Sequence, residues 1–198
     1  MQLVQTASRG MPPKQPSLLR LLCIAVLLLL LGAAAARADT ITVKSAELLA
    51  EDENYVLNAQ FDFSFNPTLE EALHKGISLY FVLEFELGRP RWYWLDEKLA
   101  QLTVQHRLSY APLTRQYRLT SGLLSQQFDS LEEVERILSR VVSRPVVPRD
   151  ALVRGTRYDA SLRLRLDQTQ LPKPFQINAL ASRDWSLQSD WYRWNFTP

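Results

Sequence analysis

Hydrophobic and polar residues alternate along several stretches of this chain, which is the pattern of antiparallel strands with one buried face. In residues 54–65 every second residue is apolar or aromatic, and residues 77–87 and 157–167 repeat the pattern. We expect each of these stretches to form a strand. A strand at 41–50 is predicted as the hairpin partner of 54–65, and strands at 99–110 and 114–120 as a second antiparallel pair. Gly88-Arg89-Pro90 is predicted to be a turn, and Arg91 to Trp94 to begin the next strand. Two more strands are predicted near the C-terminus, at 174–180 and 185–196.

Two short helices are predicted between the strands. Thr68 and Glu71 have the spacing of a capping box, in which the side chains at the start of a helix bond to exposed backbone N–H groups. Gly76 is the residue type that most often follows the end of a helix. Ser130 and Glu133 form a second capping box. The sequence therefore predicts one helix before the strand 77–87 and another after residue 130.

The second helix is expected to continue to about Val142. An apolar stripe at helical spacing supports this length, because one side of the helix can then pack on the core. Residues 143–148 contain two prolines and are predicted to be a loop. The stripe consists of Leu131, Val134, Ile137, Leu138 and Val141.

Many short strands with few helices are typical of two packed antiparallel sheets. We therefore expect a mainly β fold, an antiparallel β-sandwich that is immunoglobulin-like in general architecture, with the two short helices in connections. Residues 39–198 have the length of one domain. The sequence thus predicts a single β-sandwich domain over 39–198.

The first 38 residues have the three parts of a secretory signal. Basic residues precede an uncharged apolar run at residues 21–31, and Ala36-Arg37-Ala38 has small residues at the two positions that a signal peptidase reads. We expect cleavage after Ala38, a mature N-terminus at Asp39 and a periplasmic location. The alternative is an uncleaved segment, residues 18–36, that anchors the protein in the inner membrane, and only then do we expect membrane contact.

Removal of residues 1–38 changes the charge of the protein. Four of the 23 basic residues and none of the 21 acidic residues lie there, so the net charge changes from +2 to −2. A domain that binds nucleic acid carries a basic patch of its own, and we expect no nucleic acid as a partner. The one cysteine, Cys23, is also removed, which excludes thiol catalysis, disulfides and cysteine metal sites from the mature domain.

Three parts of the sequence resemble a known family. They are FNPTLEEALHKGISLYFVLEFELGRPRWYW, LSYAPLTRQYRLT, and LPKPFQINAL followed by RDWSLQSDWYRW, and they are similar to the domain of unknown function 4390 family of exported proteobacterial proteins. Members are often encoded near two-component regulatory genes, so the resemblance implies an envelope role beside a membrane sensor. It implies no active-site residues, because the family is uncharacterised.

The mature sequence holds little that indicates catalysis or metal binding. His74 and His106 are its two histidines, and neither has a metal-ligand spacing around it. No serine-nucleophile or phosphate-loop motif is present. We therefore predict no catalytic residue, no metal site and no cofactor, and we interpret both histidines as structural.

Paired charges on two predicted strands indicate a contact between them. Glu84 and Glu86 face the same side of the strand 77–87, and Arg163 and Arg165 have the same spacing in 157–167. Two carboxylates that serve glycoside chemistry flank a bond across a cleft, whereas neighbours on one strand more often pair with an adjacent strand. We hypothesise a ladder of ion pairs, each worth about 0.2–1 kcal/mol.

The five tryptophans lie in two clusters, and the first gives the candidate binding residues. Trp92 and Trp94 share one face of a predicted strand, and Arg89 and Arg91 flank the preceding turn. These four residues are predicted to bind a ligand or partner, since aromatic plates stack on sugars or side chains and arginines grip anions. The alternative is that the rings fill the core. Trp185, Trp191 and Trp194 form the second cluster.

Three functions follow from these patterns. The first is a non-catalytic protein-interaction or accessory module in the envelope, whose partner is an envelope or membrane protein. The second is a binder of cell-wall glycan or another periplasmic ligand through the Trp and Arg surface. The third is an enzyme with a dispersed site, which no motif favours. We expect the first of these, and we expect no enzyme activity.

Overall fold

The computed structural model describes residues 41–89 and 97–198. The predicted signal at residues 1–38 and the expected N-terminus at Asp39 lie outside the described residues, as do Arg91, Trp92 and Trp94. Within the described ranges, no helix is both long and apolar enough to cross a membrane.

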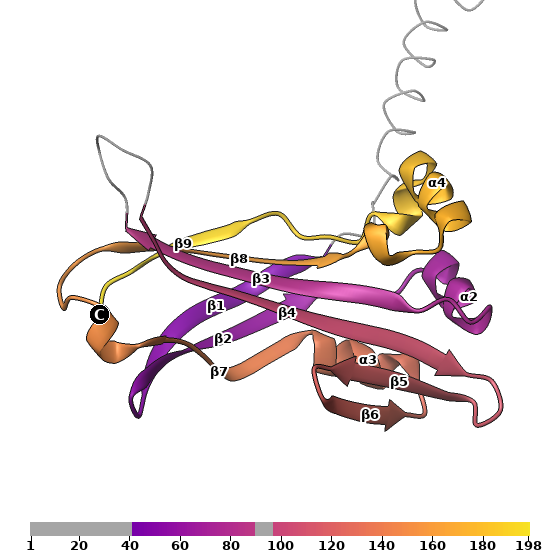
Figure 1. The fold of residues 1–198 in the computed structure, drawn as a ribbon, viewed down its shortest axis with the longest axis horizontal. Coiled ribbons are helices and arrows are strands. Elements are labelled where there is room, and N and C mark those ends of the chain that lie inside the picture. Colours follow the sequence, from indigo (N-terminus) through magenta and orange to yellow (C-terminus); the bar gives the residue numbers. More distant parts are fainter. Residues whose placement is uncertain (1–40, 90–96) are drawn as a thin grey trace, which may run out of the picture. The chain divides into compact units, whose positions relative to one another are not determined.

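Two antiparallel sheets form the domain and confirm the mainly β prediction (Figure 1). The smaller sheet has the order β1-β2-β7 and the larger has the order β6-β5-β4-β3-β8-β9. The strands are β1 (Thr42–Glu51), β2 (Asn54–Asp62), β3 (Leu79–Arg89), β4 (Glu97–Ala111), β5 (Gln116–Ser121), β6 (Leu124–Phe128), β7 (Arg140–Pro148), β8 (Tyr158–Leu166) and β9 (Tyr192–Phe196).

Helices occupy the connections between strands. The α-helices are α2 (Pro67–His74), α3 (Leu131–Leu138) and α4 (Lys173–Ala181), and single turns of 3-10 helix are η2 (Arg149–Ala151), η3 (Gln168–Gln170) and η4 (Arg183–Trp185). The helices α2 and α4 lie at the same end of the larger sheet, whereas α3 lies against β5 and β6 (Figure 1).

The two sheets enclose one hydrophobic core, as expected of a sandwich. The predicted alternation holds in the central strands, where the inward residues Phe81 and Phe85 of β3 and Leu162 of β8 are all at most 1% exposed. Leu57 and Phe61 of β2 meet them from the smaller sheet. Since apolar burial is the main stabilising term in folding, this core determines which face of the larger sheet is turned outward.

The start of α2 differs from the prediction. Asn66, not Thr68, caps the helix, because its side-chain oxygen accepts a hydrogen bond of 2.9 Å from the backbone N–H of Leu69. Pro67 then occupies the first helical position, where its missing N–H costs nothing. The end of α2 agrees with the prediction, since Gly76 has a φ of +84°, which a glycine adopts readily.

The predicted helix up to Val142 was too long, and the predicted loop at 143–148 was wrong. α3 ends at Leu138, and the chain then enters β7, which pairs antiparallel with β2. Pairing with β2 outweighs helical periodicity at Val141, which lies opposite Ala59. The prolines are compatible with a strand because β7 is at the edge of its sheet.

The C-terminal region also departs from the prediction. Residues 174–180 lie in the helix α4 instead of a strand, because short apolar runs fit either period. Of the predicted strand 185–196, only 192–196 is a regular strand. At the other end of the sheet, Gly88 and Arg89 belong to β3 and are not a turn.

Candidate functional site

The outer face of the larger sheet carries a compact group of charges. Glu84 of β3 lies directly opposite Arg163 of β8. Arg163 donates to the Oε2 atom of Glu84 at 2.6 Å, and Arg165 donates to its Oε1 atom at 3.0 Å. The predicted ladder is therefore confirmed for Glu84, which takes both arginines. Glu86 instead pairs with Lys98 of β4 at 3.0 Å.

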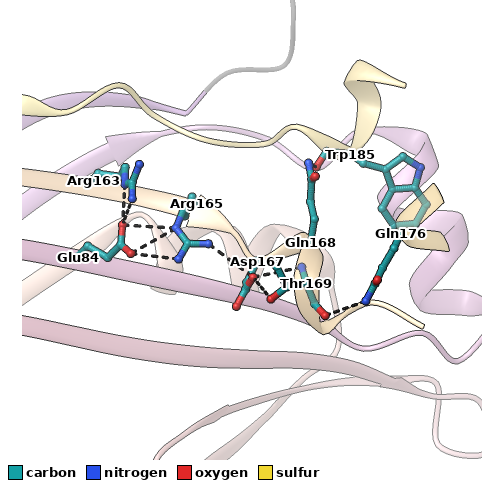
Figure 2. A network of polar contacts seen from close by, with 8 residues as sticks. All are labelled: Glu84, Arg163, Arg165, Asp167, Gln168, Thr169, Gln176 and Trp185. Atoms are coloured by element: carbon teal, nitrogen blue, oxygen red, sulfur yellow. Dashed lines mark hydrogen bonds and ion pairs between the residues drawn. The ribbon is translucent and has the colours of Figure 1, made fainter. Parts of the chain in front are cut away.

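This charge group continues into the C-terminal helices (Figure 2). Arg165 lies 3.6 Å from Asp167, and one oxygen of Asp167 accepts bonds from the backbone N–H and the hydroxyl of Thr169. The backbone oxygen of Thr169 accepts a bond of 2.8 Å from Gln176 of α4. The contacts thus connect the sheet face to α4 without a break.

The local environment keeps Glu84 ionised. Burial alone would raise the pKa of Glu84, but hydrogen bonds from Arg165 and Arg163, with the charges of both, outweigh it and hold the pKa below its ordinary value. The hydrogen bond to Glu84 also raises the pKa of Arg165, assisted by the charges of Glu84 and Asp167. Side chains that are paired on several sides hold one conformation, so these charged residues form a rigid support for the side chains that pack on them.

Trp191 is the aromatic residue that packs on this charged group. The guanidinium carbon of Arg163 lies 4.4 Å from the centre of the Trp191 ring. Trp191 is half-buried and lines two hollows. The smaller hollow has a volume of about 240 Å³ and is also lined by Ile41 and Asp190. Trp191 is therefore accessible from both hollows, and the Arg163 guanidinium holds its ring in place.

The larger of these hollows has a volume of about 380 Å³ and lies over the end of β3. Charges of both signs line it. Glu86 and Lys98 come from β3 and β4, and Asp159 and Arg193 come from β8 and β9. Such a lining accepts a side chain or ligand that carries both polar and apolar parts. The lining residues are Glu86, Leu87, Gly88, Lys98, Asp159, Ala160, Ser161, Trp191 and Arg193.

One of the four predicted binding residues is adjacent in the sequence to a residue of this hollow. Arg89 is the last residue of β3 and follows Gly88, which lines the hollow. Arg91, Trp92 and Trp94 lie outside the described residues, so their part of the prediction stays a prediction. Sequence reasoning missed Trp191 as a candidate, although the cluster of three tryptophans near the C-terminus was a usable signal.

The other two tryptophans of that cluster have packing roles. Trp185 is buried and lies 5.9 Å, between ring centres, from Phe175 of α4. Trp194 packs on Phe85 in the core at 6.2 Å. Trp191, by contrast, lines the two hollows described above.

The two histidines lie apart from this region. His74 is 3.0 Å from the hydroxyl of Tyr117 and packs edge-on against Tyr110. His106 lies in β4, and burial, followed by the charge of Arg144, lowers its pKa. In residues 41–89 and 97–198, no three His, Cys, Asp or Glu side chains gather closely enough to hold a metal ion.

Comparison with protein-family models matched residues 38–195 to a family described as "Domain of unknown function (DUF4390)". Comparisons with curated proteins and with solved structures gave no match. The matched range covers all the elements described above except the last residue of β9, Phe196, and it confirms the resemblance seen in the sequence. The chain therefore belongs to the domain of unknown function 4390 family.

Proposed function

We propose that this chain is an exported, non-catalytic envelope module that binds another protein through the larger of the two hollows beside Trp191. The observation that carries the proposal is the support of Trp191 by Arg163, which is itself held by Glu84. Tryptophan and arginine are the residues most enriched at binding hot spots. A ring that is already ordered loses less entropy when a partner binds.

The charges around the hollow favour a protein as the partner. Lys98 and Arg193 lie at the same hollow as Glu86 and Asp159, so an approaching chain can find a partner for either sign of charge. Mixed charges of this kind set orientation and exclude wrong partners more than they add affinity. We expect the partner to be an envelope or membrane protein with an apolar side chain between polar ones.

Site-specific photocrosslinking in cells tests this proposal. A benzophenone amino acid at Arg193, at the hollow, should capture a reproducible membrane or envelope protein. Arg118 is the matched control, since it is an exposed arginine on the same outer face of the same sheet but lies on β5. Equal capture from both positions, or capture from neither, would contradict the proposal.

A second candidate is the binding of a cell-wall saccharide, and the half-buried ring of Trp191 favours it. Sugar rings stack on tryptophan, and Ser161 and Asp159 offer hydrogen-bonding groups at the same hollow. Titration of the exported protein with muropeptides, followed by tryptophan fluorescence, separates the two candidates. Saturable quenching that Trp191→Ala abolishes would support the saccharide, whereas no quenching together with crosslinking from Arg193 supports the protein partner.

A further inference from the structure

The strand β6 is an open edge of the larger sheet. It pairs with β5 on one side, and no described strand pairs with its other side. Its sequence, Leu-Ser-Gln-Gln-Phe, has no charge and no proline, and its register with β5 has no bulge. Exposed edges with regular, uncharged backbone readily pair with another strand.

The other three edge strands are blocked against such pairing. β7 contains Pro145 and Pro148 as well as two arginines, and its register with β2 shifts twice. β1 carries Lys44 and two glutamates, and its register also shifts. β9 carries Arg193. Charges, prolines and bulges are the usual means by which edges avoid association, so among the described edges β6 differs from the rest.

The backbone of β6 has a defined set of outward groups. A two-residue turn, Gly122 and Leu123, joins β5 to β6, and the residues flanking such a turn form a hydrogen-bonded pair. Bonded and non-bonded pairs then alternate along the ladder. It follows that Ser125 and Gln127 turn their N–H and C=O groups toward the open side.

The side chains of β6 add an exposed apolar residue and a place to bury it. Leu124, Gln126 and Phe128 share the face on which Phe128 contacts the core, and Leu124 is 73% exposed. Phe128, Ile137 and Val142, together with three charged residues, line a hollow of about 710 Å³ at the far end of the strand. An exposed leucine thus lies at one end of β6, and a hollow with an apolar side and a charged side lies at the other.

We propose that a second copy of this chain pairs with β6, strand to strand, across a two-fold axis at Gln126. Antiparallel pairing in this register places Leu124 of each copy opposite Phe128 of the other, at the apolar side of that hollow. It also places Ser125 opposite Gln127, so that the outward backbone groups of both strands meet as hydrogen-bonded pairs. One register therefore satisfies both the backbone and the exposed leucine.

The charges agree with a two-fold pairing. A residue near a two-fold axis meets its own copy, so any charge there would be repelled, and β6 has none. The same axis reverses the direction of α3, whose start carries Glu132 and Glu133 and whose end is followed by Arg140. The acidic end of one helix therefore faces the basic end of the other.

Cysteine crosslinking tests the axis directly. In the full chain with Cys23→Ser, the variant Gln126→Cys places one thiol at the axis, in a non-hydrogen-bonded pair with Cα atoms about 4.5 Å apart, which a disulfide can span. Mild oxidation should convert most of it to a covalent dimer. Leu113→Cys, in the fully exposed turn between β4 and β5, is the control for random collisions.

The register has its own test. Ser125→Cys alone should crosslink poorly, because its copy lies off the axis, whereas a mixture of Ser125→Cys and Gln127→Cys should form mixed dimers. Crosslinking of Gln126→Cys that is no faster than that of Leu113→Cys would overturn the proposal, and so would efficient crosslinking of Ser125→Cys with itself.

Sedimentation of the unmodified chain gives an independent measurement. We expect a monomer–dimer equilibrium that Gln127→Pro weakens at least tenfold, because proline removes an outward N–H. Gln127→Ala keeps the N–H and should leave the association constant nearly unchanged. A wild-type chain that stays monomeric up to about 0.5 mM, which means a binding free energy weaker than about 4.5 kcal/mol, would overturn the proposal. The β6 edge lies opposite β9 in the sheet, so this interface does not depend on the proposed function.

Discussion

The guanidinium group of Arg163 lies over the ring of Trp191, with its central carbon 4.4 Å from the ring centre. The same guanidinium donates to Glu84 at 2.6 Å. Arg163 therefore couples an ion pair between two strands to the aromatic residue that lines the candidate site. Neighbouring groups that share one side chain are energetically coupled, and this coupling can be measured.

Loss of Arg163 should weaken the fold and release Trp191. We expect Arg163→Ala to lower the free energy of unfolding by about 1–3 kcal/mol, since a partly buried carboxylate loses one of its two partners. A double-mutant cycle with Glu84→Gln should give a coupling energy of about 0.5–2 kcal/mol in urea titrations. Arg118→Ala, on the same outer face, is the control and should change stability by less than about 0.5 kcal/mol. A coupling energy near zero would contradict the contact.

Glu84 should contribute to stability at neutral pH and not in acid. Its pKa is lowered in the folded protein, so the unfolded chain takes up a proton first as the pH falls. The contribution is complete above the ordinary glutamate pKa of 4.5 and is lost as the pH falls through the lower, folded value. Wild type and Glu84→Gln should therefore differ at pH 7 and converge in acid. Parallel stability curves would contradict this prediction.

His106 should make the protein less stable in mild acid. Burial, followed by the charge of Arg144, lowers its pKa from the ordinary value of 6.5, so the folded state disfavours the imidazolium. The unfolded chain then binds a proton below pH 6.5 that the folded chain refuses until the pH falls to its lower, folded pKa. Thermal unfolding between pH 7 and 5 should show a steeper loss for wild type than for His106→Gln. Identical slopes would show that His106 does not contribute.

Asn66 should matter more than Thr68 for the stability of α2. Asn66 is 6% exposed, caps the helix through Leu69, and donates a bond of 2.7 Å to the backbone oxygen of Asp184. We expect Asn66→Ala to cost about 1–3 kcal/mol, because a cap and a buried donor are both lost. Thr68→Ala should cost less than about 0.5 kcal/mol. Chemical denaturation of both variants measures the difference, and the reverse order would restore Thr68 as the cap.

The strands with strict alternation were predictable because one period fits them. In β3 and β8 the apolar residues repeat every second position over a full strand, and a shift by one residue would expose the entire set. The opposition of Glu84 and Arg163 followed from the same regularity. Its confirmation shows that matching charge spacing on two amphipathic strands can identify neighbours.

The elements that were mispredicted depend on distant parts of the chain. Val141 continues a helical stripe, but Phe61 donates a backbone bond of 2.8 Å to Ser139, and the residues that follow pair with β2 as a strand. Residues 174–180 fit a strand or a helix equally well, and contacts with η3 and η4 accompany the helix. Local pattern cannot rank two periods when a partner elsewhere supplies the difference in energy.

The candidate site, like the fold, was predictable from the sequence only in part. A resemblance in sequence identified the family, and residue type and spacing alone established the mainly β class, the outward face of β3 and β8 and the two clusters of tryptophans. The choice of Trp191 as the ring that lines the hollows required the tertiary structure, because Trp185 and Trp194 have the same side chain and differ only in what covers them. The open edge of β6 likewise depends on the strand order, since an edge is defined by the neighbour that a strand does not have.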